Sequence, residues 1–224
     1  MRTVFYIISL ILITTLAFSQ ANAASIPIDN PSFELPVLDP DAFPAYPYAY
    51  GWIEKDVDTE GSTNTGVFGN TEPNSFDHIV NAHGAQLAFL GSESGNAFEQ
   101  DLNALYQSDH DYRLTVALGI SSRFAPSQSE PLDMVELAFY YRDINDPNVI
   151  IDIASQLVDA AAMSSTQLYD YTLYLPELSQ DANYVDQQIG IAIRSVGLPG
   201  GFWTVENVRL NEFLPLMDAI ITKE

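Results

Sequence analysis

Hydrophobic and polar positions alternate along most of the chain beyond its first 25 or so residues, in short runs separated by turn residues. In the segment Tyr112–Ile120, for example, Leu114, Val116 and Leu118 alternate with smaller or polar residues. A period of two places one face of a strand in a core and leaves the other partly wet. The same criterion predicts eight strands, which are Gln86–Leu90, Ala97–Leu102, Tyr112–Ile120, Met134–Arg142, Val149–Ile153, Tyr169–Leu175, Gln188–Ser195 and Phe202–Phe213.

Helical signals are few. Leu157–Met163 favours either a turn or two of helix or an irregular strand edge, and two long loops are expected at Leu35–Tyr50 and Asp56–Ser75. The glycine-flanked segment Gly91–Gly95 is expected to join two strands as a hairpin loop. Many short strands with few helices predict an all-β fold, a β-sandwich in a single domain.

The N-terminus has the three parts of a secretory signal peptide: Arg2, the apolar run Val4–Leu16 and the small-residue pair Ala21 and Ala23. We therefore expect cleavage after Ala23, which gives a signal peptide at 1–23 and a β-sandwich domain at 24–224. The expected location is secreted or periplasmic. No other segment approaches the roughly 20 apolar residues of a membrane span, so no span is expected in the mature protein.

The charge and the cysteine content limit the classes of partner and of metal site that the protein can have. The net charge is −22, and the chain contains no cysteine. Such an acidic surface repels nucleic acid and anionic membranes, and it suits the binding of cations. Disulfides and cysteine-ligated metals are excluded.

Three stretches carry a resemblance to a known fold. They are Asn30–Glu34 followed by Gly51-Trp52, then Leu87–Gly91 with Gly95–Leu102 and Tyr112–Val116, and finally Phe202–Leu210. In this order they resemble the galactose-binding-like jelly roll of carbohydrate-binding modules and related bacterial exoproteins. Many of those exoproteins end in a Pro-Glu-Pro sorting signal, which Asn211–Glu224 does not contain. The resemblance implies a jelly-roll β-sandwich and a carbohydrate ligand.

The resemblance also implies a structural calcium ion. In such modules one carboxylate at the end of the opening strand, which Asn30–Glu34 resembles, and one on the closing strand help to hold Ca²⁺. The matching residues are Glu34 and Glu206. Calcium prefers six to eight hard oxygen ligands, so carboxylates suit it. The alternative is a pair of ordinary solvated carboxylates. Asp56–Gly61 begins like a calcium-binding hand loop, but Val67 stands at its twelfth position, so a solvated acidic loop is expected there.

Aromatic residues gather in the segment Phe43–Trp52. Sugar-binding modules stack pyranose rings on exposed aromatic faces, so Tyr46 and Tyr48 are the candidate ligand platform, with structural packing as the alternative. Trp52 and Trp203 are expected in the core because each lies on or beside a predicted strand.

Signs of catalysis are sparse. Gly91–Gly95 resembles a nucleophile elbow, but its centre is Glu93 rather than serine. His78 and His83 share a loop-rich region with Asp77. These residues form either a loose metal or acid–base site, or ordinary loop histidines without a shared function. Thirty acidic residues do not single out a catalytic pair.

These observations favour an exported, non-catalytic β-sandwich that binds carbohydrate or another extracellular polymer, with calcium as a structural cofactor. One alternative is a structural or adhesive protein of the cell surface or matrix. Another is a polysaccharide lyase or hydrolase on a jelly-roll scaffold, which a sheet face lined by tyrosine, histidine, arginine and acids would favour.

Overall fold

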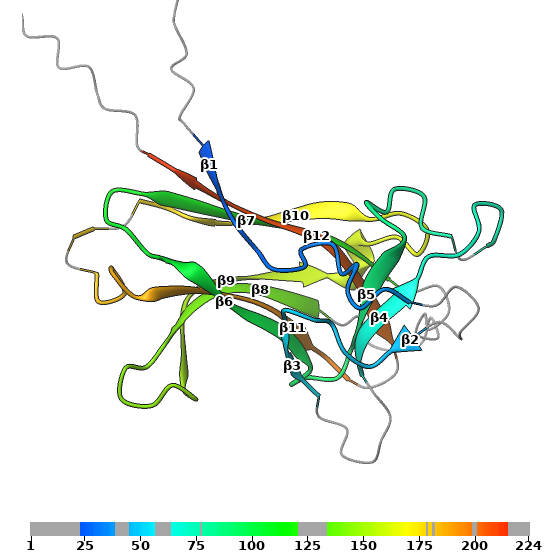
Figure 1. The fold of residues 1–224 in the computed structure, drawn as a ribbon, viewed down its shortest axis with the longest axis horizontal. Helices are drawn as coiled ribbons and strands as arrows, with labels where there is room; N and C mark the ends of the chain where they lie inside the picture. Colours follow the sequence, from blue (N-terminus) through cyan, green and yellow to red (C-terminus); the bar gives the residue numbers. More distant parts are fainter. Residues whose placement is uncertain are drawn as a thin grey trace, which may run out of the picture.

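The chain folds as two antiparallel β-sheets packed face to face, as the computed structural model shows (Figure 1). The structure describes residues 23–38, 45–56, 64–76, 78–120, 134–177, 179–180, 182–198 and 201–214. The prediction of an all-β sandwich in a single domain is confirmed.

The larger sheet has seven strands in the order β10-β7-β12-β5-β4-β2, with β1 also paired to β12. Every pairing in it is antiparallel. Its long central strand β12 pairs with β5 through its first residues and with β1 through its last. The strands are β1 (Ala23–Ile26), β2 (Ala45–Tyr46), β4 (Thr65–Gly69), β5 (Gln86–Gly91), β7 (Asp111–Ile120), β10 (Tyr169–Leu175) and β12 (Phe202–Phe213).

The smaller sheet has five strands in the order β3-β6-β11-β8-β9. These are β3 (Ile53–Lys55), β6 (Ala97–Leu105), β11 (Gln188–Val196), β8 (Met134–Arg142) and β9 (Ile150–Asp159). A 3₁₀ turn, η2 (Ala160–Ala162), follows β9, and the side chain of Asp159 caps it by accepting the Ala161 N–H. Among the described residues, no helix has the length and apolar character that crossing a membrane requires.

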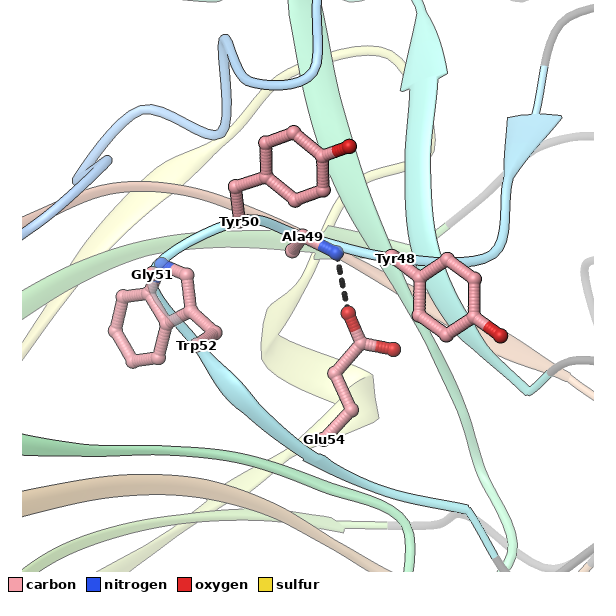
Figure 2. A pocket seen from close by; sticks show the side chains of 6 residues that line it. All are labelled: Tyr48, Ala49, Tyr50, Gly51, Trp52 and Glu54. Carbon is pink, nitrogen blue, oxygen red and sulfur yellow. Dashed lines mark hydrogen bonds between the residues drawn. The ribbon is translucent and has the colours of Figure 1, made fainter.

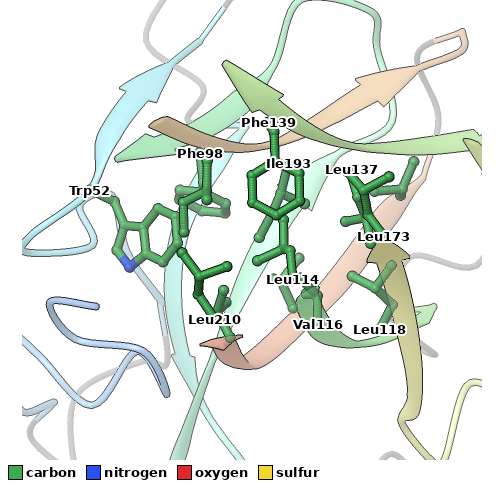
Figure 3. Packing of buried hydrophobic residues seen from close by; sticks show 14 of the residues in the cluster. Trp52, Phe98, Leu114, Val116, Leu118, Leu137, Phe139, Leu173, Ile193 and Leu210 are labelled. Carbon is green, nitrogen blue, oxygen red and sulfur yellow. The ribbon is translucent and has the colours of Figure 1, made fainter. Parts of the chain in front are cut away.

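The core lies between the sheets, and alternation along the strands builds it. On β7 the predicted inward residues Leu114, Val116 and Leu118 are fully buried. They face the aliphatic and aromatic side chains of β8, β11 and β6, as Figure 3 shows. Trp52 and Trp203 are both buried, as expected from the sequence. Trp52 stacks on Phe33, with ring centroids 5.1 Å apart.

Several local predictions were wrong. Gly91–Gly95 joins β5 to β6, which lie in different sheets, so this segment crosses the sandwich and is no hairpin. The loop expected at Asp56–Ser75 contains β4. Each of the two alternatives for Leu157–Met163 holds for part of it, because β9 runs to Asp159 and the 3₁₀ turn follows at Ala160–Ala162. Asn30–Glu34 is no strand. Asn30 and Phe33 have left-handed backbone angles, with φ of 48° and 56°, which end an extended conformation.

Candidate active site

One turn binds two carboxyl groups that lie far apart in the sequence. The backbone N–H of His83 donates to Glu206 Oε1 over 2.5 Å, and the N–H of Gly84 also binds Glu206. The N–H of Gln86 donates to Glu34 Oε1 over 3.0 Å. The structure therefore brings the predicted pair Glu34 and Glu206 to the same turn, 83–86.

Strand register explains why Glu206 lies under this turn. Trp203 and Val205 of β12 point into the core, so Thr204 and Glu206 point away from it. Glu206 lies opposite Ala117 of β7, and a register shift follows it, with Asn207 at φ 49°. Next to it, on the same outer face of the seven-stranded sheet, is a small apolar cluster formed by Ile79, Leu87, Ala117 and Leu168, with Phe68 and Ala82 at its edge.

Glu206 is a buried acid with one unused oxygen. Its exposed fraction is 1%, and within the described part of the chain Oε2 accepts no hydrogen bond. Burial is the main cause that raises the pKa of Glu206 to about 7, and the neighbouring charge of Glu34 raises it further. The two N–H donors and Arg209 act in the opposite direction. Such a carboxyl group can hold and release a proton near neutral pH.

Aromatic side chains lie along the same strand face. Phe89 of β5 is opposite Thr204, two residues from Glu206. The Phe89 ring contacts the Phe202 ring at 5.8 Å and the Phe68 ring at 6.5 Å between centroids. The hydroxyl of Thr204 is buried and has no hydrogen-bond partner among the described residues. This face therefore combines an acid, an unused hydroxyl and apolar ring surfaces.

Two asparagines hold the segment that covers the apolar cluster. The side chain of Asn70 binds both the N–H and the carbonyl of Ile79, each at 3.0 Å. The side chain of Asn81 binds the N–H and the carbonyl of Leu168 in the same way, at 2.8 and 2.7 Å. Between these anchors and Gln86, residues His83 and Gly84 are exposed. The turn over Glu206 is thus anchored on both sides but meets solvent in the middle.

A separate open pocket of about 390 Å³ lies beside β3 (Figure 2). It is lined by Tyr48, Ala49, Tyr50, Gly51, Trp52 and Glu54. The carboxyl group of Glu54 accepts the N–H of Ala49 and, over 2.8 Å, the hydroxyl of Thr65 on β4. Of the two predicted platform residues, Tyr48 lines this pocket, whereas Tyr46 lies on β2 with its side chain outside the described part.

The outer face of the five-stranded sheet carries a tyrosine, arginine and acid cluster. Tyr140 donates to Asp101 over 2.9 Å, and Arg142 binds the other oxygen of Asp101 over 2.7 Å. Glu99, whose pKa burial raises, lies 3.7 Å from Arg142. This cluster is the feature that the enzymatic alternative called for, but its charges are largely paired with one another.

The histidines do not form one centre. The His78 ring lies 2.5 Å from the carbonyl of Thr71, and the His83 ring lies 3.3 Å from the hydroxyl of Ser32. Asp77 lies outside the described residues. Within the described ranges, no group of three or more acidic or histidine side chains is placed to hold a metal ion.

A single-domain β-sandwich with a buried, near-neutral acid on an apolar sheet face defines a candidate small-molecule enzyme. The family comparison agrees with this class. A family model described as HpiC1 cyclase matches residues 24–211. The chain belongs to this HpiC1-like family. No curated protein matches the chain.

Solved cyclase structures share the fold. A cyclase from Fischerella sp. TAU in complex with 4-(1H-indol-3-yl)butan-2-one is 24% identical, with a TM-score of 0.65, over 84% of this chain and 97% of that one. The Stig cyclase Fisc from Fischerella sp. TAU, in complex with (3Z)-3-(1-methyl-2-pyrrolidinylidene)-3H-indole, is 24% identical, with a TM-score of 0.61, over 85% and 98%. An apo cyclase from Fischerella sp. is 22% identical, with a TM-score of 0.63, over 86% and 97%.

The family match corrects the functional prediction. A non-catalytic domain that binds carbohydrate or another polymer is wrong, and so is a polysaccharide or glycan as the partner, because the family consists of cyclases. The enzymatic alternative was nearer, although its polysaccharide substrate has no support. The prediction rested on motifs whose residues form the core and the turns of a β-sandwich. Binding proteins and enzymes share this scaffold, so the motifs do not distinguish between them. The resemblance to a jelly roll was therefore sound for the sandwich and not for the function.

Glu206 as an acid was missed because its chemistry depends on burial. The chain segment that buries it comes about 120 residues earlier in the sequence. One signal was available. In the strand Phe202–Leu210, Glu206 is the only carboxylate, next to the apolar residues Val205 and Val208.

Proposed function

We propose that this protein is a cyclase for a small, aromatic, indole-bearing substrate, with Glu206 as the general acid. The observation that carries the proposal is the buried Glu206 carboxyl group, whose pKa is raised to about 7 and whose Oε2 is unused by the described residues. A catalytic acid works best when its pKa lies near the working pH. Membership of a cyclase family supplies the reaction class, and the indole compounds bound by two structural relatives suggest the substrate class.

The proposed reaction is an acid-initiated isomerisation. The Glu206 O–H bond breaks as its proton passes to a carbon of a substrate double bond, which leaves a positive charge on the neighbouring carbon. A second double bond of the same substrate attacks that carbon and closes the ring. The new cation then loses a proton, and Glu206 recovers one. The sum of atoms and electrons is unchanged, so no oxidant or reductant is needed.

The surroundings of Glu206 suit this chemistry. Phe89 and its ring neighbours Phe68 and Phe202 offer apolar faces to an aromatic substrate. Ring faces also stabilise a developing positive charge. The hydroxyl of Thr204 is a donor or acceptor that can orient a polar group of the substrate.

Substrate access requires movement of one turn. Glu206 is almost fully buried, and the exposed residues His83 and Gly84 bind its carboxyl group through their backbone N–H groups. We propose that the substrate enters by displacing this turn, while the asparagine anchors at Asn70 and Asn81 keep the flanking segment in place.

The test is product analysis with deuterium. Wild-type protein is incubated in D₂O with a panel of indoles that carry an alkenyl side chain, and products are examined by mass spectrometry and NMR. We expect a cyclised isomer that contains one deuterium on the carbon that received the acid proton. Glu206→Gln should fold and give no such product, whereas Glu54→Gln should retain the activity. Turnover by Glu206→Gln at the wild-type rate would overturn the role of Glu206.

As an alternative to the acid role of Glu206, we propose calcium as a structural cofactor, with Glu34 and Glu206 as its carboxylate ligands. The orphaned Glu206 Oε2 and the nearby Glu34 supply hard oxygens, and the remaining ligands would be backbone carbonyls and water. A proton and Ca²⁺ exclude one another at Glu206 Oε2. Calcium should therefore raise the melting temperature and inhibit turnover. If a chelator changes neither, calcium does not occupy the pair.

Export is proposed on the sequence alone. We propose a signal peptide at 1–23, a mature domain at 24–224 and a secreted or periplasmic location. N-terminal sequencing and fractionation of protein expressed from the full gene test this. A cytoplasmic protein that retains Met1 would contradict it.

A further inference from the structure

The pocket beside β3 has a composition that selects charge as well as shape. Its wall contains one carboxyl group, three aromatic rings and two small residues, and no basic side chain is among the residues that line it. Figure 2 shows the Glu54 carboxyl group directed at the backbone of Ala49. Tyr48 and Tyr50 are exposed by 59% and 54%, so both rings face solvent at the mouth of the pocket.

Two protein donors fix the position of Glu54. The N–H of Ala49 binds one carboxylate oxygen, and the Thr65 hydroxyl binds the other. Each oxygen has a second lone pair, so the group can still accept a charge-assisted hydrogen bond from a ligand. The two donors come from the segment beside β3 and from β4 of the opposite sheet, so the carboxyl group is held rigidly at the edge of the sandwich.

We propose that this pocket binds a protonated aromatic amine, with the ammonium group on Glu54 and the ring against Tyr48 and Tyr50. Tyrosine faces attract cations and stack on aromatic rings. The net charge of −22 raises the local concentration of cations and repels anions. A volume of about 390 Å³ suits a small molecule at the lower end of the usual range of ligand pockets.

This site is independent of Glu206. The pocket is built from the segment 48–54 at the β3 edge, whereas Glu206 lies on β12 under the turn 83–86. Trp52 forms part of the pocket wall, and its indole N–H donates to the carbonyl of Asn30 over 3.2 Å. Tryptophan fluorescence should therefore change on pocket occupancy, on top of the signal from Trp203, which does not line the pocket.

The experiment compares three aromatic probes of similar size with one aliphatic amine. Phenethylamine, 2-phenylethanol, 3-phenylpropionate and n-butylamine are titrated into the full protein, with tryptophan fluorescence and calorimetry as readouts. Phenethylamine should bind at least tenfold tighter than the alcohol, which corresponds to about 1.4 kcal/mol. It should also bind tighter than n-butylamine, and the carboxylate should show no saturable binding. Equal affinity for amine and alcohol, or no saturable amine binding, would overturn the proposal.

Variants distinguish amine binding at Glu54 from a general attraction of amines to the acidic protein. Glu54→Gln should reduce the preference for amine over alcohol to within about twofold, so that at most about 0.4 kcal/mol of it remains. Tyr48→Ala should weaken both ligands together. Glu212→Gln, a half-buried glutamate outside the pocket, removes the same charge and should change nothing. Glu206→Gln should retain amine binding, so this proposal and the proposed cyclase activity can fail separately. An amine preference that survives in Glu54→Gln would refute the assignment.

Discussion

The carboxyl groups of Glu34 and Glu206 are bound by a single turn, through the N–H of Gln86 on one side and those of His83 and Gly84 on the other. Glu34 lies near the start of the described chain, and Glu206 lies on the closing strand. The turn therefore connects both ends of the domain to the outer face of the seven-stranded sheet. The stability of this turn therefore depends on the protonation state of the Glu206 carboxyl group that it binds.

Stability should fall as pH rises through about 7. The folded-state pKa of Glu206 is raised from an ordinary value of 4.5 because burial penalises the charged form. The stabilisation from this group is complete below 4.5 and is lost as the pH rises through about 7. We expect the melting temperature to drop by a few degrees between pH 6 and pH 8, and Glu206→Gln to remove most of that drop. An identical pH dependence in the variant would argue against a buried, neutral carboxyl group.

Gly84→Ala should be destabilising, whereas Gly69→Ala should be nearly neutral. A Cβ on Gly84 would lie 1.9 Å from Glu34 Oε1, so Glu34 would have to move and give up the Gln86 N–H. A Cβ on Gly69 would meet no atom within 4 Å. We expect a cost of about 1–3 kcal/mol for the first change and under about 0.5 kcal/mol for the second, measured by urea unfolding. The Gly84→Ala cost should shrink in a Glu34→Ala background. Full additivity would show that Glu34 does not cause it.

The sequence predicts strands that are long and regularly alternating. The predicted bounds of β8, β10 and β12 match the structure residue for residue. The short strands β2, β3 and β4 were missed because two to five residues show no clear period. In β4, the sequence Thr-Gly-Val-Phe-Gly includes two glycines, which disfavour a strand on local grounds. Pairing with β5 determines that strand instead.

The sequence did not predict which strands pair with one another or which acidic side chains are buried. Gly91–Gly95 has the composition of a hairpin loop, yet β5 pairs with β12 and β4 rather than with β6. Local turn chemistry does not reveal which sheet a strand joins. Glu206 and Glu54 illustrate the same limit at the level of sites. Burial is the main cause that raises the pKa of each, and each accepts a hydrogen bond from a residue that is distant in the sequence or in the opposite sheet.

Tyr140→Phe should cost more than Tyr174→Phe, although both remove a hydroxyl bound to an aspartate. Tyr140 is fully buried against Gly190 and donates to Asp101, which Arg142 also binds. Burial and the charge of Asp101 raise the pKa of Tyr140 far above its usual range. Tyr174 is exposed and donates to Asp111. We expect losses of about 1–2 kcal/mol for Tyr140 and under about 0.5 kcal/mol for Tyr174 in urea unfolding. Equal costs would show that the buried cluster adds no stability.

Asn30 should connect the amine pocket to the rest of the N-terminal segment without touching a ligand. Its side-chain amide donates to the carbonyls of Leu35 and Tyr50 over 2.9 and 2.8 Å, and it accepts the Leu35 N–H over 3.1 Å. Its φ of 48° lies in the left-handed region, which asparagine and glycine tolerate better than alanine.

Two substitutions at Asn30 separate these effects. Asn30→Ala loses the hydrogen bonds and adds backbone strain, whereas Asn30→Gly loses the bonds alone. We expect Asn30→Ala to be less stable than Asn30→Gly by about 1 kcal/mol, as measured by urea unfolding. Both variants should weaken phenethylamine binding because the carbonyl of Tyr50, in the pocket wall, loses its anchor. Wild-type affinity in both would show that the pocket does not depend on Asn30, and equal stability of the two would show that the left-handed backbone is not strained by alanine.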